Sequence, residues 1–156
     1  MPSADIDIRR DDPTDPTFQP IFVRHLTLMR ETSPPESVHA LAPADLAVPG
    51  VFFYGMRVGG ALVGMGAFKA IDAAHCEIKS MHVLSEARGQ GLARRLLEHL
   101  LAEARAAGFL RMSLETGVEP PFAPARLLYE RAGFEICGPF EGYWNDPNSV
   151  FMTRSL

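Results

Sequence analysis

The chain lacks the features that would place it in a secreted or membrane class. Its only cysteines are Cys76 and Cys137, and no apolar run reaches the roughly 18 residues that span a bilayer. Two lone cysteines in apolar surroundings are typical of buried free thiols in a reducing compartment. The residues at the start, 1–5, also lack the basic and apolar regions of a signal peptide. We therefore expect a cytoplasmic protein that makes no contact with a membrane.

Positive charge is also scarce, and it is scattered. The 15 lysines and arginines are outnumbered by 19 acidic residues, which gives a net charge of −4. A nucleic-acid-binding protein usually carries a clustered basic patch, so we expect no nucleic-acid partner. Only Lys69 and Lys79 are lysines, a bias that by itself implies no function. The spacing of His39, His82 and His99 does not suit metal ligands, so we expect no metal.

What the sequence does have is a regular alternation of strand-like and helix-like segments. The chain is long enough for one domain with a real core, and we expect residues 1–4 to form a flexible tail before a domain over 5–156. The predicted order is β-α-α-β-β-β-α-β-α-β-β, an α/β fold built as an α+β mixed sheet. The predicted strands cover about 5–9, 51–58, 62–71, 75–84, 110–115, 134–137 and 150–153, and the predicted helices about 18–30, 34–41, 91–107 and 124–133.

The start of the second predicted helix rests on a capping signal. Ser33 and Glu36 have the spacing of a capping box, with prolines at the first helical positions between them. This pattern predicts a short helix that begins there and runs to about Leu41.

The most informative segment is Arg88-Gly89-Gln90-Gly91-Leu92-Ala93, between a predicted strand and a strongly amphipathic helix. Two glycines and an alanine allow a tight turn and leave backbone N–H groups uncovered. The first turn of the helix adds its own unpaired N–H groups and the positive end of its dipole. Such a corner is typical of an anion site, most simply a phosphate site.

Two common phosphate motifs fit this corner poorly. A P-loop requires a lysine after its last glycine, and no lysine lies near the corner. A dinucleotide fingerprint requires a third glycine where Arg94 stands, although Glu115 could imitate its ribose-binding acid. A nucleotide-binding oxidoreductase therefore remains open as a weaker alternative, as does a plain glycine-rich turn.

A third motif, Gln/Arg-x-x-Gly-x-Gly/Ala, is satisfied by Arg88, Gly91 and Ala93. Here the chain resembles the GNAT acetyltransferase superfamily. Residues 77–83 look like the fourth strand of that family, and residues 127–134 look like its late helix-to-strand junction. The resemblance extends over nearly the whole chain and implies the GNAT-type acyl-CoA N-acyltransferase fold.

Two further segments narrow the resemblance. Residues 113–117 and 146–152 are similar to a bacterial branch named after indole-acetate acetyltransferase. The name of that branch says little about the substrate of this chain.

The resemblance implies acetyl-CoA as co-substrate. In the family the glycine corner binds the pyrophosphate, and the pantetheine arm lies where the fourth strand splays from the fifth. The implied contacts are the backbone of Met81 and Val83 for the arm and of Arg88, Gly89, Gln90, Gly91, Leu92 and Ala93 for the pyrophosphate.

Acetyl transfer to an amine requires a base that accepts a proton and benefits from an acid that protonates the leaving thiolate. By resemblance Glu77 is the first candidate for the base, with Glu115 at the exit of the fifth strand as the second. Tyr129 stands at the position of the family's frequent general acid. One departure is Phe122, which replaces the asparagine that many relatives use to bind the arm.

The acceptor pocket is expected between residues 30–39 and 140–149, which correspond to variable segments around the family's substrate cleft. Aromatic side chains such as Trp144 could line it, and Arg30 or Arg126 could hold a carboxylate. We therefore expect an N-acetyltransferase that acts on a small-molecule amine. A non-catalytic acyl-CoA sensor is the alternative, and a homodimer is compatible with the family without being argued for by any segment.

Overall fold

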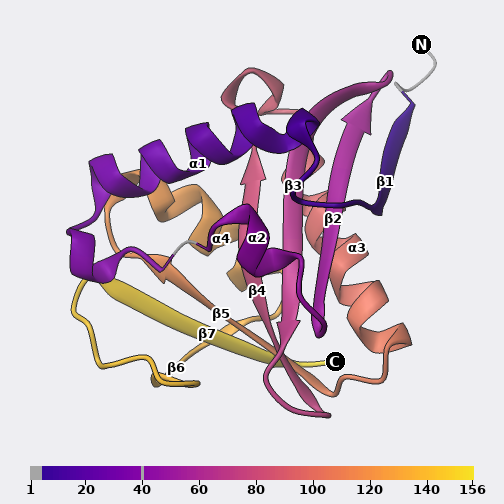
Figure 1. The fold of residues 1–156 in the computed structure, drawn as a ribbon. Coiled ribbons are helices and arrows are strands. Elements are labelled where there is room, and N and C mark those ends of the chain that lie inside the picture. Colours follow the sequence, from indigo (N-terminus) through magenta and orange to yellow (C-terminus); the bar gives the residue numbers. More distant parts are fainter. Residues whose placement is uncertain (1–4, 40) are drawn as a thin grey trace.

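The computed structural model describes residues 5–39 and 41–156, so the predicted tail over 1–4 lies outside the described residues. Its centre is a seven-stranded mixed sheet with the strand order β1-β2-β3-β4-β5-β7-β6 (Figure 1). All neighbouring strands are antiparallel except β4 and β5, which are parallel. The strands are β1 (Ile6–Arg10), β2 (Val51–Val58), β3 (Ala61–Ala70), β4 (His75–Val83), β5 (Arg111–Gly117), β6 (Glu135–Cys137) and β7 (Ser149–Ser155).

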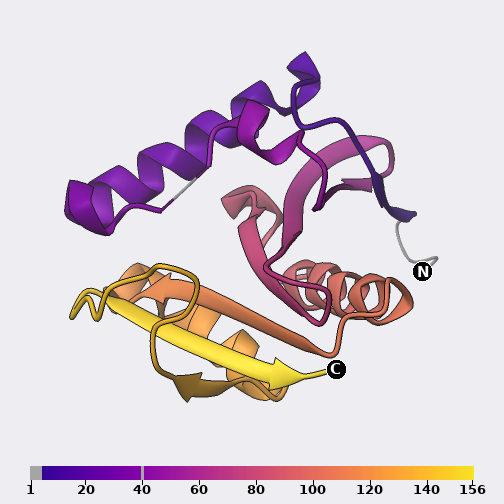
Figure 2. The ribbon, with the colours of Figure 1, turned by 60° about the horizontal axis from the view of Figure 1, so that its bottom comes forward.

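Helices cover both faces of this sheet. The front face is covered by α1 (Gln19–Thr32) and the short α2 (Pro43–Leu46), and the back face by α3 (Leu92–Ala106) and α4 (Ala123–Arg131) (Figures 1 and 2). Each layer buries the apolar side of its helices, because a sheet face and a helix stripe exclude water only by packing together. The predicted fold class and element order are confirmed.

The sheet opens between its two parallel strands. Pairing of β4 with β5 ends at Glu77 and Ser113 after only three residue pairs, although both strands continue. Figure 2 shows the two halves of the sheet diverging from this point. The remaining edge groups of the two strands therefore have no partner across the gap, and each half of the sheet is held by its own helices.

The second helix begins later than predicted. Residues Pro35–Ser37 form a single 3-10 turn, and the helix proper starts at Pro43. The predicted capping box does not form, because Pro34 rather than Ser33 stands at the N-cap and offers no side-chain hydrogen bond. A proline also disfavours the helical conformation in the residue before it, which moves Ser33 and Pro34 to extended backbone.

A β-bulge in β4 changes which side chains face the site. Ser80 and Met81 together lie opposite the single residue Gly66 of β3, and Ser80 has a positive φ of 53°. Simple alternation would have placed Met81 and Val83 on the same face as Glu77. The extra residue reverses this order, because side chains alternate with a period of two.

The bulge therefore corrects two sequence-based placements. Met81 and Val83 pack toward the back face, against the cores beneath α3. The same alternation predicts that His82 faces away from Glu77, but His82 points to the front and meets α1. Its Nδ1 atom lies 3.0 Å from Nδ1 of His25, so one ring nitrogen donates and the other accepts.

Candidate active site

The glycine corner has the geometry of an anion site. Gly89 and Gly91 adopt left-handed backbone, with φ of 82° and 71°, which glycine enters without steric cost. Among the described residues, no hydrogen-bond acceptor is paired with the N–H groups of Gly89, Gln90 and Gly91. The first N–H groups of α3, from Leu92 and Ala93, are unpaired as in any helix. Five successive donors thus lie at one exposed bend, with the side chain of the neighbouring Arg88 also exposed.

Glu77 lies at the point where the sheet opens, but its carboxylate is already engaged. The residue is only 2% exposed. Its Oε2 atom accepts a hydrogen bond from the Tyr143 hydroxyl and lies 3.1 Å from the Lys79 ammonium. Lys79 also donates to the Tyr143 oxygen at 2.6 Å. The three side chains form a closed cluster that neutralises the buried charge.

Tyr143 reaches this cluster from the loop between β6 and β7. The same loop is attached to the segment after α1 by a buried hydrogen bond from the Ser37 hydroxyl to the Asp146 carboxylate. Burial and the neighbouring Glu77 raise the pKa of Tyr143, so its hydroxyl remains a donor. Sequence reasoning placed Tyr143 only in the acceptor segment. Its hydrogen bond to Glu77 joins residues that are 66 positions apart in the sequence, so no local sequence pattern predicts it.

Glu115 has different surroundings from Glu77. It lies on β5 beyond the last pair with β4, and its Oε1 accepts a hydrogen bond of 3.1 Å from the Ser149 hydroxyl. Burial raises the pKa of its carboxyl to about 7, against a smaller opposing effect from Ser149 and Lys79. A carboxyl that titrates near neutral pH can exchange a proton in either direction under physiological conditions.

Tyr129 approaches the same opening from the back face. It lies on α4, is 7% exposed, and its hydroxyl is 3.7 Å from the sulfur of Met81 on β4. Burial and the nearby Glu115 charge raise its pKa, so the phenol stays protonated. Its side chain faces the body of the protein, where it joins the main core cluster.

A cavity of about 290 Å³ lies beside Glu77 on the front face. It is formed by the loop before α2, by β3 and β4, and by the loop that carries Tyr143. Its lining residues are His39, Lys69, Glu77, Lys79, Glu141, Gly142, Tyr143 and Trp144. Both segments expected to form an acceptor pocket therefore contribute to one cavity that borders the opening between β4 and β5.

Other candidate residues lie elsewhere. Arg126 donates to the carbonyl oxygens of Gly117 and Glu119, so its guanidinium holds the loop after β5. Arg30 is exposed in the last turn of α1 and does not line the cavity. Phe122, expected to stand where many relatives have an asparagine, is buried beside Gly117.

The sequence model described as Acetyltransferase (GNAT) family matches residues 17–134 of the chain. The chain belongs to the GNAT family. The match includes the opening between β4 and β5, the glycine corner and Tyr129, the features that the geometry had already brought together.

The chain is also similar to individual GNAT proteins. It is 44% identical to YsnE of Bacillus subtilis, which is named an uncharacterized N-acetyltransferase, over 96% of this chain and 99% of that one. It is 38% identical to the IAA acetyltransferase of Azospirillum brasilense, over 97% of this chain and 98% of that one. The resemblance to the indole-acetate branch is therefore confirmed.

Solved structures show the same architecture. A Klebsiella pneumoniae protein described as an acyl-CoA N-acyltransferase superposes with a TM-score of 0.79 at 31% identity, covering 97% of both chains. The chain is thus an acyl-CoA-dependent acetyltransferase of the GNAT family.

A metal-binding cluster and a membrane-spanning helix are both absent from the described part of this GNAT chain. Within residues 5–39 and 41–156, no group of three or more His, Cys, Asp or Glu side chains is placed to hold a metal ion. None of the helices in that part of the chain is long and apolar enough to cross a membrane.

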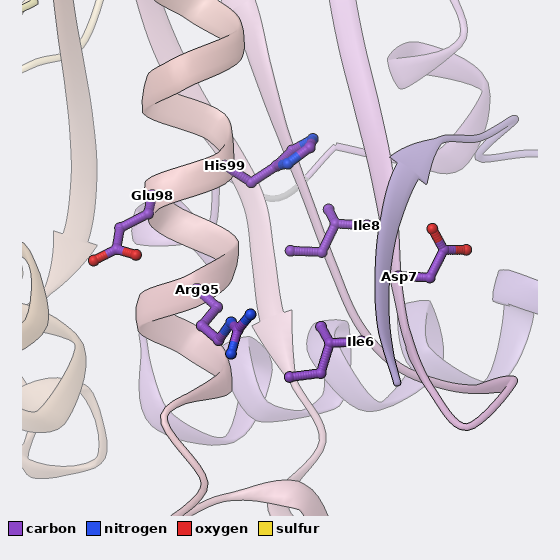
Figure 3. Close-up of a pocket in the computed structure, with 6 residues that line it drawn as sticks. All are labelled: Ile6, Asp7, Ile8, Arg95, Glu98 and His99. Carbon is purple, nitrogen blue, oxygen red and sulfur yellow. The ribbon is translucent and has the colours of Figure 1, made fainter. Parts of the chain in front are cut away.

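A second cavity, of about 500 Å³, lies away from this site between β1 and α3. Figure 3 shows its lining side chains, which come from these two elements and are mostly polar: Ile6, Asp7, Ile8, Arg95, Glu98 and His99. None of the residues expected to act in catalysis or to bind a cofactor takes part in it.

Proposed function

We propose that the protein transfers the acetyl group of acetyl-CoA to the amine of a small molecule by direct attack on the thioester. The observation that carries this proposal is the opening between β4 and β5, which has the glycine corner at the end of β4 and the 290 Å³ cavity on the front face. In this proposal one ligand binds at the corner and extends through the opening to the cavity.

The residues of the chain fit acetyl-CoA. The five free N–H groups from Gly89 to Ala93 suit its pyrophosphate, and the exposed Arg88 adds positive charge. The unpaired edges of β4 and β5 suit the amide-bearing arm, with the backbone of Met81 and Val83 as its partner. A backbone N–H that polarises the thioester carbonyl is worth about 3 kcal/mol of barrier.

Glu115 is the less engaged of the two candidate bases, although Glu77 rather than Glu115 lines the cavity. The Glu115 carboxyl has a pKa near 7 and one hydroxyl donor, so it can take a proton from the attacking amine, directly or through water. Glu77 is committed to Tyr143 and Lys79. We assign to Glu77 the role of holding the Tyr143 loop against the sheet.

Tyr129 supplies the complementary proton. Its phenol is protonated and buried beside Met81, on the side of the opening opposite the cavity. A thiolate that leaves there gains a proton as the bond to the acetyl carbon breaks. The base and the acid thus lie on the two sides of the same gap.

The test is release of free thiol from acetyl-CoA by purified protein in the presence of a panel of small amines, with the acetylated product identified by mass spectrometry. Amine-dependent thiol release would support the proposal. Heat on injection of coenzyme A without thiol release by any amine would favour the acyl-CoA sensor. If the injection of coenzyme A produced no heat, both the transferase function and the sensor function would be overturned.

A cytoplasmic location is part of this proposal. Cys76 and Cys137 are both free, and burial raises the pKa of Cys76 to about 12. Unpaired thiols fit a reducing compartment, where acetyl-CoA is also available. A fluorescent fusion excluded from the cytoplasm would contradict it.

A further inference from the structure

The only two lysines of the chain line the same cavity. Of the 15 basic residues, all but Lys69 and Lys79 are arginines, and no arginine lines the cavity beside Glu77. The sequence alone gave no reason for the scarcity of lysine, but the structure places both lysines at one cavity. Compact ammonium groups gather where the acceptor is expected, and the planar guanidinium groups lie elsewhere.

The two lysines differ in what they bind. Lys79 is paired with the buried Glu77 and donates to Tyr143, so its charge is balanced within the protein. Lys69 is half-buried and makes no ion pair or side-chain hydrogen bond with any described residue. It lies directly opposite Glu77 in the register of β3 and β4, yet that carboxylate is taken by Lys79 and Tyr143.

No other charge in the cavity neutralises Lys69. Glu141 is exposed on the rim and forms no ion pair with it. Burial and the Lys79 charge lower the pKa of His39, so this ring contributes no charge at neutral pH. Lys69 is therefore an unmatched cation that faces a cavity with space for a ligand. Away from bulk water such a cation attracts an anion more strongly than it does at the open surface.

We propose that the acceptor carries an anionic group, most simply a carboxylate, and that Lys69 binds it. The inference rests on the proposed function, because it names the class of amine that the site would acetylate. β3 and β5 lie on opposite sides of β4, so the anion and the reacting amine are at opposite ends of the acceptor. Trp144, which is half exposed, adds an apolar surface to the lining of the cavity.

Binding can be measured apart from catalysis because Trp144 is the single tryptophan of the chain. Its fluorescence is titrated with amino acids and with their primary carboxamides, which differ only in charge. Suitable pairs are 5-aminopentanoate with 5-aminopentanamide, and 4-aminomethylbenzoate with 4-aminomethylbenzamide. The wild type is expected to bind each acid about tenfold to a hundredfold more tightly than its amide, as for a hydrogen bond to a charged group.

Three variants test the role of Lys69. Lys69→Met should remove the preference for the acid, and Lys69→Arg should keep most of it. Arg105→Met, which removes an exposed cation at the end of α3 on the back face, should leave it unchanged. Equal binding of acid and amide by the wild type, a preference that survives in Lys69→Met, or no response to any acid at millimolar concentration would each overturn the inference.

The same ligands separate this inference from the proposed function. If the acids bind through Lys69 but no thiol is released from acetyl-CoA, the anion site stands and the transferase proposal fails. If thiol is released equally with acids and amides, the transferase proposal stands and the role of Lys69 fails.

Discussion

Glu77 and Glu115 lie on neighbouring strands and have opposite surroundings. The Glu77 carboxylate is bound by the Lys79 ammonium and the Tyr143 hydroxyl. The Glu115 carboxylate has a single hydroxyl donor, and burial raises its pKa to about 7. The Glu77 carboxylate belongs to a buried ion pair, and its removal would leave the Lys79 charge uncompensated. The difference between the two carboxylates is therefore one of environment, not of residue type.

The assignment of Glu115 as base predicts a pH dependence. The base acts only when deprotonated, so kcat/KM should rise with pH through about 7. Glu115→Gln, which can still accept the Ser149 hydrogen bond, should lower kcat about a hundredfold or more. It should also remove the rise of kcat/KM near pH 7, called the limb below. The measurement is the pH profile of both proteins on one acceptor, so that the titration of the acceptor itself cancels.

Glu77→Gln is the matched comparison for that prediction. It should lower the free energy of unfolding, because Lys79 loses its buried partner, while the limb near pH 7 is retained. If the limb vanished in Glu77→Gln and persisted in Glu115→Gln, the roles of the two carboxylates would have to be exchanged.

Tyr129 carries a prediction that separates catalysis from binding. Tyr129→Phe removes the phenolic proton but keeps the ring, which packs edge-on against Phe134. Turnover should fall by about a hundredfold, while the Kd for coenzyme A measured by calorimetry changes little. Tyr54→Phe serves as the control, since Tyr54 is equally buried but lies near His99, remote from the opening. Equal loss of activity in both variants would mean that Tyr129 is only a core residue.

At the scale of elements, the glycine corner and the other end of α3 form a natural pair. Gly91 precedes the helix with φ of 71°, and Gly108 follows it with φ of 93°. An added Cβ would meet nothing within 4 Å at either position. The strain of an alanine is thus similar at both, about 1 kcal/mol, and only their relation to the anion site differs.

Gly91→Ala should therefore weaken coenzyme A binding about tenfold, because alanine disfavours the left-handed turn that presents the free N–H groups. Gly108→Ala should lose the same stability and bind normally. Calorimetry for binding and urea denaturation for stability test both statements. Unchanged binding in Gly91→Ala would remove the corner from the proposed site.

The bulge in β4 is the second element that decides the site. By inserting one residue at Ser80, it leaves Glu77 and Lys79 on the front face and turns Met81 to the back, where it meets Tyr129. The strand thus contributes Glu77 and Lys79 to the front cavity and Met81 to the contact with Tyr129 on the back face. In a regular strand Met81 would share the front face with Glu77 and would not meet Tyr129 behind the sheet.

At the scale of the whole molecule, few polar contacts join α1 to the sheet beside the site. His25 and His82 pair across this interface, and burial lowers the pKa of both to about 4. Arg24 adds an exposed pair with Glu86, in the turn that leads to the glycine corner. Two buried histidines, uncharged at neutral pH, therefore supplement the apolar packing of α1 on the sheet.

This pair predicts an acid sensitivity of the fold. Because both folded-state pKa values lie below the usual value of 6.5, the pair contributes its full stability above about pH 6.5 and loses it as pH falls through about 4. His25→Phe/His82→Phe should lose less stability than the wild type between pH 7 and pH 4.5, measured by urea denaturation. His99→Gln, an exchange on α3 at the back of the sheet, should follow the wild type.

The sequence by itself determined the order of the elements, the glycine corner and the family. These depend on local patterns, namely hydrophobic periodicity and glycines where the backbone turns, and such patterns act over a few neighbouring residues. The start of α2 was the local exception, since two prolines displaced the expected cap.

Only the tertiary structure decided which side chains meet at the site. The bulge that turns Met81 and His82 around, the cluster of Glu77 with Lys79 and Tyr143, and the free Lys69 all depend on contacts between distant segments. The pKa of Glu115 has the same origin, because burial is a property of the packed molecule and not of the residue. Periodicity specifies elements, but charge balance and exposure arise only when those elements pack together.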